Sequence, residues 1–182
     1  MRATMFFPIA LLFTGSCMNY GAAPGTSSRM MIPAGPGAGA TVHDASGRML
    51  GMLTIVETGG HLTMVGTLRG LPPGSHGIHL HAVGRCDAPG FTTAGGHWNP
   101  GARQHGFENP LGSHMGDMRN VVVGDDSIGT VNASTMSGVL RGDGGAMDAD
   151  GLAIVVHAMT DDYRTEPSGN SGARIACGVV TP

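Results

Sequence analysis

Histidines are the main candidates for metal-binding residues in this sequence, and the first group lies in two short apolar runs. His79 and His81 are two residues apart in GIHLHAV, and His157 closes the run LAIVVHA. Successive side chains of a β-strand point to opposite faces, so a spacing of two places both imidazoles of the pair on one face. Such histidines are metal-ligand candidates, with buried, hydrogen-bonded structural histidines as the alternative. His76 falls on the other face, which favours a structural role with backbone hydrogen bonds.

A second group lies on a long segment without apolar alternation. It contains His97, His105, His114 and Asp117. Three imidazoles and one carboxylate match the ligand number and chemistry of a four-coordinate zinc site. Metal binding would then order the segment, so folding and binding would be coupled. The alternative is a solvated histidine-rich loop.

The elements that must position these groups are short β-strands. Runs such as GMLTIVE, HLTMVGTL, GIHLHAV and LAIVVHA are separated by turns that contain Gly, and no window shows a helical period. Many short strands with turn signals predict an antiparallel sandwich or barrel. Two stretches, 84–120 and 160–174, break this pattern, and loops of that length in a compact domain are typically functional or disordered.

Composition limits the classes of partner. Of 182 residues, 32 are Gly, 41% are hydrophobic and only 13% are charged, with a net charge of −3. The hydrophobic share excludes a disordered chain. The net charge indicates no basic surface for nucleic acid, so we expect no nucleic-acid partner. The length fits one domain, which we assign to residues 40–182, after a flexible tether of Gly, Ala, Pro and Ser at 18–39.

The N-terminus predicts export. Met1-Arg2 is followed by an apolar run at 5–13 and by TGSC, which is similar to a bacterial lipobox. We therefore assign residues 1–17 to an export signal of lipoprotein type, with lipidated Cys17 attaching the protein to a membrane facing the periplasm. An ordinary cleaved signal is the alternative. Cys86 and Cys177 then form an even pair in an exported protein, which favours a disulfide over the weaker alternative of zinc binding.

Five motifs in order resemble the bacterial copper/zinc superoxide dismutases. They are GIHLHAVGRC, TAGGHWNPGARQHG, SHMGDMRNV, VVHAMTDD and GNSGARIACGV, and the resemblance spans about residues 40–180. It implies an all-β fold, an eight-stranded Greek-key β-sandwich or barrel with long metal-binding and electrostatic loops. It also implies one copper and one zinc per subunit. The copper ligands would be His79, His81, His97 and His157, and the zinc ligands His97, His105, His114 and Asp117.

The resemblance also implies roles for single residues. His97, common to both sets, would bridge the metals and act in catalysis as a proton donor. Asp161 would join the copper ligand His79 to the zinc ligand His105, and Arg174 would guide the anionic substrate. Cys86 and Cys177 would form the disulfide.

The implied activity converts superoxide to O₂ and H₂O₂ by one-electron cycling of copper, with zinc in a structural role. A non-catalytic periplasmic copper/zinc buffer is the alternative, and Arg174 and Asp161 argue against it, because storage needs neither an anion guide nor a link between two sites. Pro167 stands where many eukaryotic members of the family carry a steering Lys, so Arg164 is a candidate substitute. No motif fixes the oligomeric state, which leaves a monomer or a homodimer.

Overall fold

The computed structural model describes Met1 and residues 37–182. The predicted export signal with Cys17, and the predicted tether as far as residue 36, lie outside the described residues. The first strand, β1 (Ala38–Asp44), begins two residues before the expected domain start, because Ala38 and Gly39 pair with Ile55 and Thr54. Within the described part of the chain, no helix is long and apolar enough to cross a membrane.

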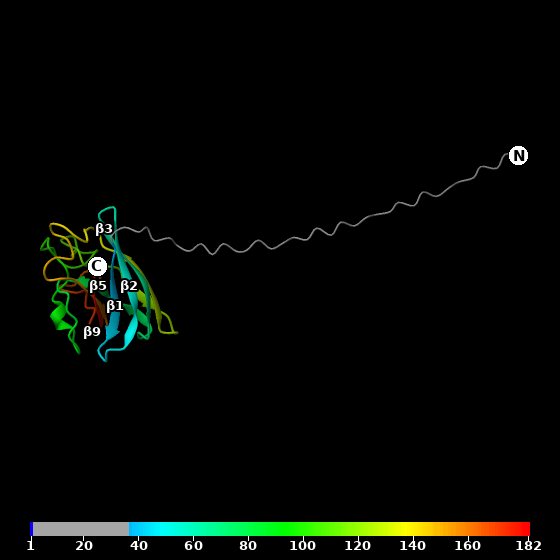
Figure 1. Cartoon of the computed structure of the whole chain (residues 1–182), viewed down its shortest axis with the longest axis horizontal. Helices are drawn as coiled ribbons and strands as arrows, with labels where there is room; N and C mark the ends of the chain where they lie inside the picture. Colours follow the sequence, from blue (N-terminus) through cyan, green and yellow to red (C-terminus); the bar gives the residue numbers. More distant parts are fainter. Residues whose placement is uncertain (2–36) are drawn as a thin grey trace. The chain divides into compact units, whose positions relative to one another are not determined.

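Nine antiparallel strands form one nearly closed barrel (Figure 1). After β1 they are β2 (Met49–Thr58), β3 (His61–Arg69), β4 (Gly74–His76), β5 (Ile78–His81), β6 (Val121–Val123), β7 (Ile128–Ser134), β8 (Ala153–His157) and β9 (Arg174–Val179). Their order across the sheet is β4-β6-β7-β3-β2-β1-β9-β8-β5. The connection from β7 to β8 passes four strands, as in a Greek key. The predicted all-β barrel is confirmed.

The strand count differs from the eight that the resemblance implies, and Gly77 is the reason. β4 and β5 are consecutive in the chain and are separated by Gly77 alone. They nevertheless lie at opposite ends of the sheet order, where β4 pairs with β6 and β5 pairs with β8. A single strand that is interrupted at Gly77 therefore contributes β4 to one edge of the sheet and β5 to the other edge. It brings the two edges together, and its two halves are counted as separate strands.

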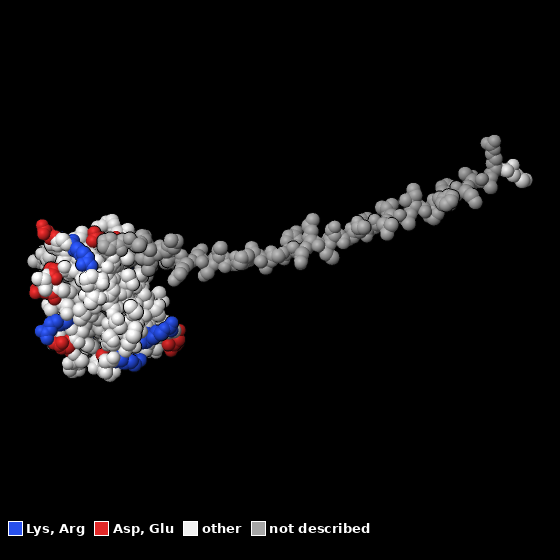
Figure 2. Space-filling model, viewed as in Figure 1, with Lys and Arg blue, Asp and Glu red and all other residues white. Residues whose placement is uncertain are grey.

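The barrel interior follows the alternation of the strands. Leu53 and Ile55 of β2 are buried, whereas Met52 and Thr54 are exposed; Leu50 is also buried, at the register shift between β1 and β2. A turn at Gly59-Gly60 joins β2 to β3, where Thr58 pairs with His61. Charged side chains of both signs lie around the margin of the face seen in Figure 2, and most of that face is uncharged.

Unlike β2, the strands β5 and β8 are buried on both faces. Their outer faces carry three of the histidines singled out in the sequence. All four residues of β5 and all five of β8 are buried. Ile78, Leu80, Ile154 and Val156 face the barrel core, while Ala153 and Val155 pack outside it against Phe91, Ala94 and Cys177. The two predicted long loops cover this outer face, on which His79, His81 and His157 lie.

Candidate metal centre

The pairing of β5 with β8 brings the three strand histidines together. His79 pairs with Val155 and His81 with Ala153, so both imidazoles share the face that His157 joins two residues further along β8. Each ring is oriented through one nitrogen. His81 Nδ1 donates to Gly95 O at 3.0 Å, His157 Nδ1 donates to Gly172 O at 3.3 Å, and His79 Nε2 lies 2.7 Å from Asp161 Oδ2. The second nitrogen of each ring is left for another partner.

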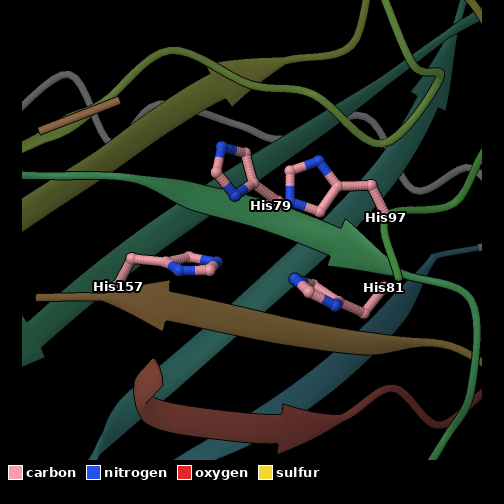
Figure 3. Close-up of side chains that lie close together, drawn as sticks. All are labelled: His79, His81, His97 and His157. Carbon is pink, nitrogen blue, oxygen red and sulfur yellow. The ribbon is translucent and has the colours of Figure 1, made fainter. Parts of the chain in front are cut away.

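His97 completes this group from the loop. The loop runs antiparallel beside β5, with a bridge between His81 and His97 and a hydrogen bond of 2.8 Å from Trp98 N to Leu80 O. Four buried nitrogens have no hydrogen-bond partner in residues 37–182: His79 Nδ1, His81 Nε2, His97 Nε2 and His157 Nε2. The ligand atoms of these residues lie within 4.8 Å of one another (Figure 3). We call His79, His81, His97 and His157 the four-nitrogen set.

The second group forms around one carboxylate oxygen. Asp117 Oδ1 lies 2.8 Å from His97 Nδ1, 3.0 Å from His105 Nδ1 and 3.3 Å from His114 Nδ1. The other oxygen, Oδ2, accepts the backbone N–H groups of Gly106 and His114. Ligands of a tetrahedral zinc ion stand about 3.3 Å apart, so the separations suit such an ion. We call His97, His105, His114 and Asp117 the carboxylate set; His97 belongs to both sets.

Asp161 connects the two sets a second time. Its Oδ2 is 2.7 Å from His79 Nε2, and its Oδ1 is 3.0 Å from His105 Nε2. The backbone N–H of Tyr163 also donates to Oδ1, at 2.6 Å. One buried carboxylate thus orients one imidazole of each set, as outer carboxylates around metal sites commonly do.

The surroundings lower the pKa of some imidazoles in the site and raise the pKa of another. Burial lowers the pKa of His97 to about 4 against the opposing effect of Asp117, and burial together with His79 lowers the pKa of His157 to about 3. Burial also lowers the pKa of His81 well below its usual range. For His105, burial is outweighed by hydrogen bonds to Asp117 and Asp161, which raise its pKa to about 9. Those bonds hold the pKa values of both aspartates well below normal, against their burial.

A cleft of about 330 Å³ opens onto both sets. It is lined by His81, His97, His114, His157 and Arg174, among others, and among the described residues Arg174 is the only Lys or Arg of its lining. The guanidinium is fixed by Nη1 to Phe91 O at 2.8 Å and by Nη2 to Gly95 O at 2.7 Å. Three residues later, Cys177 is bonded to Cys86, which confirms the predicted disulfide. The disulfide ties the long loop to β9 close to the cation.

The comparisons with known proteins decide the family. The sequence profile described as copper/zinc superoxide dismutase matches residues 49–180. The chain is 39% identical over 145 residues to a Cu-Zn superoxide dismutase of Caulobacter vibrioides, covering 78% of this chain and 83% of that one. The chain belongs to the copper/zinc superoxide dismutase family. A further relative, the superoxide dismutase-like protein YojM of Bacillus subtilis, is 42% identical over 111 residues, or 60% of this chain and 57% of that one.

Solved structures of the copper/zinc superoxide dismutase family share the fold. A SOD-like protein from Bacillus subtilis superimposes with a TM-score of 0.73 at 37% identity, covering 79% of this chain and 97% of that one. The Cu/Zn superoxide dismutase from Brucella abortus gives a TM-score of 0.63 at 27% identity, covering 80% and 99%. The family uses copper and zinc, and both histidine sets of this chain are able to hold a metal ion. Because the family also contains proteins named only superoxide dismutase-like, the activity must be argued from the residues.

Other residues singled out in the sequence have different surroundings. His76 has its two ring nitrogens 2.9 Å from His157 O and 2.8 Å from Pro72 O, which confirms its predicted structural role. Arg164 pairs with Glu108, 2.8 Å away. Glu166 is a further residue at the site, which no sequence motif predicts, and its carboxylate contacts two residues of the carboxylate set. No periodicity or spacing could have indicated it, because the contact joins loop residues 61 positions apart.

Proposed function

We propose that this chain is a superoxide dismutase that holds copper at the four-nitrogen set and zinc at the carboxylate set, one ion of each per subunit. One observation carries the assignment: four buried imidazole nitrogens without a partner converge on one point, and one of them belongs to His97. An unpartnered buried polar atom costs about 1–3 kcal/mol, so four at one place favour a ligand there. All-imidazole ligation suits copper, and a set of three imidazoles and a carboxylate suits zinc.

Copper supplies a centre that gains and loses one electron, whereas zinc does not change its oxidation state. The balanced reaction takes two superoxide anions and two protons to O₂ and H₂O₂. One superoxide is oxidised and the other reduced, so no further electron donor or acceptor is needed. The protein must bring an anion to the cleft and deliver protons to the reduced oxygen.

Arg174 meets the first requirement. The chain has a net charge of −3, so attraction of an anion must be local. Two backbone carbonyls hold the guanidinium at the wall of the cleft, beside His81 and His157. A fixed cation in a narrow cleft focuses the field on a small target and raises the rate of encounter.

His97 meets the second requirement. Its Nδ1 is held at the carboxylate set, 2.8 Å from Asp117, while its Nε2 faces the other set. The ring is therefore fixed at one nitrogen, and the other can hold a proton whenever it is not engaged as a ligand. From that position Nε2 can pass the proton to the developing peroxide, as a general acid.

The direct test is metal analysis of the purified protein together with a superoxide-decay assay. We expect one copper and one zinc per chain and decay far above the uncatalysed rate. A protein that binds both metals and leaves the decay at the uncatalysed rate would be the copper/zinc buffer, and the enzymatic proposal would be rejected.

We also propose that the chain is exported to the periplasm and anchored through lipidated Cys17. The export-type N-terminus supports this, as does the Cys86–Cys177 disulfide, since disulfides persist outside the reducing cytosol. Cell fractionation tests it, because Cys17→Ser should move the protein from the membrane to the soluble periplasmic fraction. Release of the unaltered protein by osmotic shock alone would reject the anchor.

A further inference from the structure

Glu166 reaches from the 160–174 loop to two residues of the carboxylate set. Its Oε1 accepts the backbone N–H of His105 and lies 3.9 Å from His114 Nε2. The side chain is 46% exposed and lines the cleft that contains Arg174. Within the described residues it is the only carboxylate of the cleft lining. Neither the metal ligation proposed above nor the proton path uses it.

His105 is therefore held at both ends by one loop. Asp161 lies 3.0 Å from its ring nitrogen Nε2, and Glu166 accepts its backbone N–H. The first contact fixes the rotation of the imidazole, and the second fixes the backbone that carries it. Together these two contacts orient His105 so that its Nδ1 points toward Asp117 Oδ1, 3.0 Å away.

The negative charge of Glu166 also complements the positive charge that a zinc ion would bring to the carboxylate set. A divalent ion beside Asp117 leaves excess positive charge, and a metal-bound imidazole passes part of it to its outer N–H. For His114, whose Nδ1 faces Asp117, that outer group is Nε2, the atom that stands 3.9 Å from the Glu166 carboxylate. The attraction is screened at a half-exposed position, so its contribution is smaller than that of the fully buried Asp161.

We propose that Glu166 is a positioning residue for the zinc site, one that slows zinc loss and, reciprocally, lets bound zinc order the 160–174 loop. The reciprocity follows from linkage, because any contact that strengthens zinc binding is itself strengthened by zinc. This inference depends on the proposed zinc occupancy of the carboxylate set. It adds a residue that acts through His105 and His114, without contact to substrate.

Glu108 provides a matched control. It also joins the two loops, through Arg164, with its Oε2 2.9 Å from Nε and 2.8 Å from Nη2. Its side chain is 53% exposed, close to the value for Glu166, and in residues 37–182 no hydrogen bond or ion pair joins that side chain to the carboxylate set. Glu108→Ala therefore removes a loop-to-loop carboxylate of similar exposure without touching a zinc ligand.

The experiment measures zinc release from the copper- and zinc-loaded protein into an excess of a chromogenic chelator. We expect Glu166→Ala to release zinc about 10-fold faster, at the lower end of the 10- to 100-fold loss typical for outer partners of metal ligands. Glu166→Gln should lie between Glu166→Ala and the unaltered protein, since its amide oxygen can accept the His105 N–H but carries no charge. Glu108→Ala should release zinc at the unaltered rate.

Two further measurements separate the possible failures. Amide hydrogen exchange in the 160–174 loop should be slowed by zinc in the unaltered protein and in Glu108→Ala, and much less in Glu166→Ala. Equal zinc release by Glu166→Ala and the unaltered protein, or equal acceleration by Glu166→Ala and Glu108→Ala, would overturn the inference. Absence of zinc from the unaltered protein would instead overturn the proposed function. Zinc should raise the melting temperature of Glu166→Ala less than that of the unaltered protein, and an equal rise in both would show a merely structural role.

Discussion

The two halves of the metal centre share His97 but are built on opposite principles. The four-nitrogen set stands mainly on β5 and β8, and its rings are oriented by Gly95 O, Gly172 O and Asp161. The carboxylate set is carried by a loop without regular strands and gathers around one oxygen of Asp117. Strand pairing fixes the first set before any ion arrives, whereas mutual attraction of charged groups shapes the second.

Protonation shows the same contrast. In the four-nitrogen set, burial lowers the pKa values of His81, His97 and His157, so the rings are neutral at pH 7 with lone pairs ready for a metal. In the carboxylate set, hydrogen bonds to Asp117 and Asp161 outweigh burial and raise the pKa of His105 to about 9. An ion entering the first set therefore gives partners to atoms that have none, whereas an ion entering the second displaces protons.

Removal of the shared residue should have the largest effect. His97→Ala takes one ligand from each set and the proton donor from the cleft, so we expect at least about a 100-fold loss in the rate of superoxide decay. Both metals should be retained less well in metal analysis. His61→Ala, which removes an exposed histidine at the start of β3, is the control and should change neither. Full zinc content with normal activity in His97→Ala would refute the bridging role.

Reversal of the charge at Arg174 should lower the rate of superoxide decay and leave zinc binding at the carboxylate set unchanged. Arg174→Glu replaces local attraction by repulsion, so we expect about a tenfold or greater loss of rate and a rate that rises with ionic strength. In the unaltered protein the rate should fall with ionic strength. Arg69→Glu makes the same change in net charge at an exposed position on β3 and should keep the falling profile. An unaltered salt profile in Arg174→Glu, or a loss of zinc, would contradict this division.

A pair of glycines tests how closely Asp161 must be placed. Gly169 has a φ of +64°, and a Cβ atom there would overlap Asp161 Oδ1 and lie 2.8 Å from His105 Nε2. Gly47 has a φ of +84° with nothing within 4 Å of a Cβ. Alanine at either position costs about 1 kcal/mol of folding free energy through the left-handed backbone.

Only Gly169→Ala should also weaken metal binding, by about tenfold for zinc, because it displaces the carboxylate from His105. Copper affinity should fall less, since two of the other three ligands of the four-nitrogen set are oriented by backbone carbonyls. Competition with chelators measures both affinities. Equal losses of zinc in Gly169→Ala and Gly47→Ala would show that the position of Asp161 is not critical.

Sequence reasoning reached the two sets by different routes, and the structure explains why. The period of a strand places His79 and His81 on one face without further information, but only the register of β5 on β8 brings His157 beside them. That register is set by long-range pairing, which no local pattern records. The carboxylate set has no period at all, so the motif resemblance carried its assignment.

Local patterns also failed in two places. The break at Gly77 divides one expected strand into β4 and β5, since each half pairs with a different neighbour. No spacing indicates Glu166, because its partners lie on another loop. Contacts between loops depend on the whole fold and are invisible to spacing rules.

The last predicted effect concerns the stability of the metal-free protein between about pH 4 and about pH 9, above the range in which Asp117 and Asp161 lose their stabilising contribution. The unperturbed pKa of histidine is about 6.5. His97 and His157 have lowered pKa values of about 4 and about 3, so the unfolded chain binds more protons than the folded chain below pH 6.5. Their contribution is complete above pH 6.5 and is lost as the pH falls toward 4 and then 3. His105 behaves in the opposite way, because its pKa is raised to about 9: its contribution is complete below pH 6.5 and is lost as the pH rises through 9.

The free energy of unfolding of chelator-treated protein should therefore be greatest near pH 6.5 and decline on both sides, by about 3 kcal/mol for each ring shifted to about 4 or about 9 and by about 5 kcal/mol for the ring shifted to about 3. Urea unfolding across this range measures it. His157→Gln should make the acid side less steep and leave the alkaline side unchanged, because it removes one of the rings whose burial opposes protonation and leaves His97 in place. His105→Gln should make the alkaline side less steep, because it removes the cation that Asp117 and Asp161 stabilise, and the effect of the lost hydrogen bonds on the two aspartates should appear only below about pH 4. If either variant flattened both sides, the two sets would titrate as one coupled cluster through His97, and the contrast between a strand-fixed and a charge-shaped half would have to be abandoned.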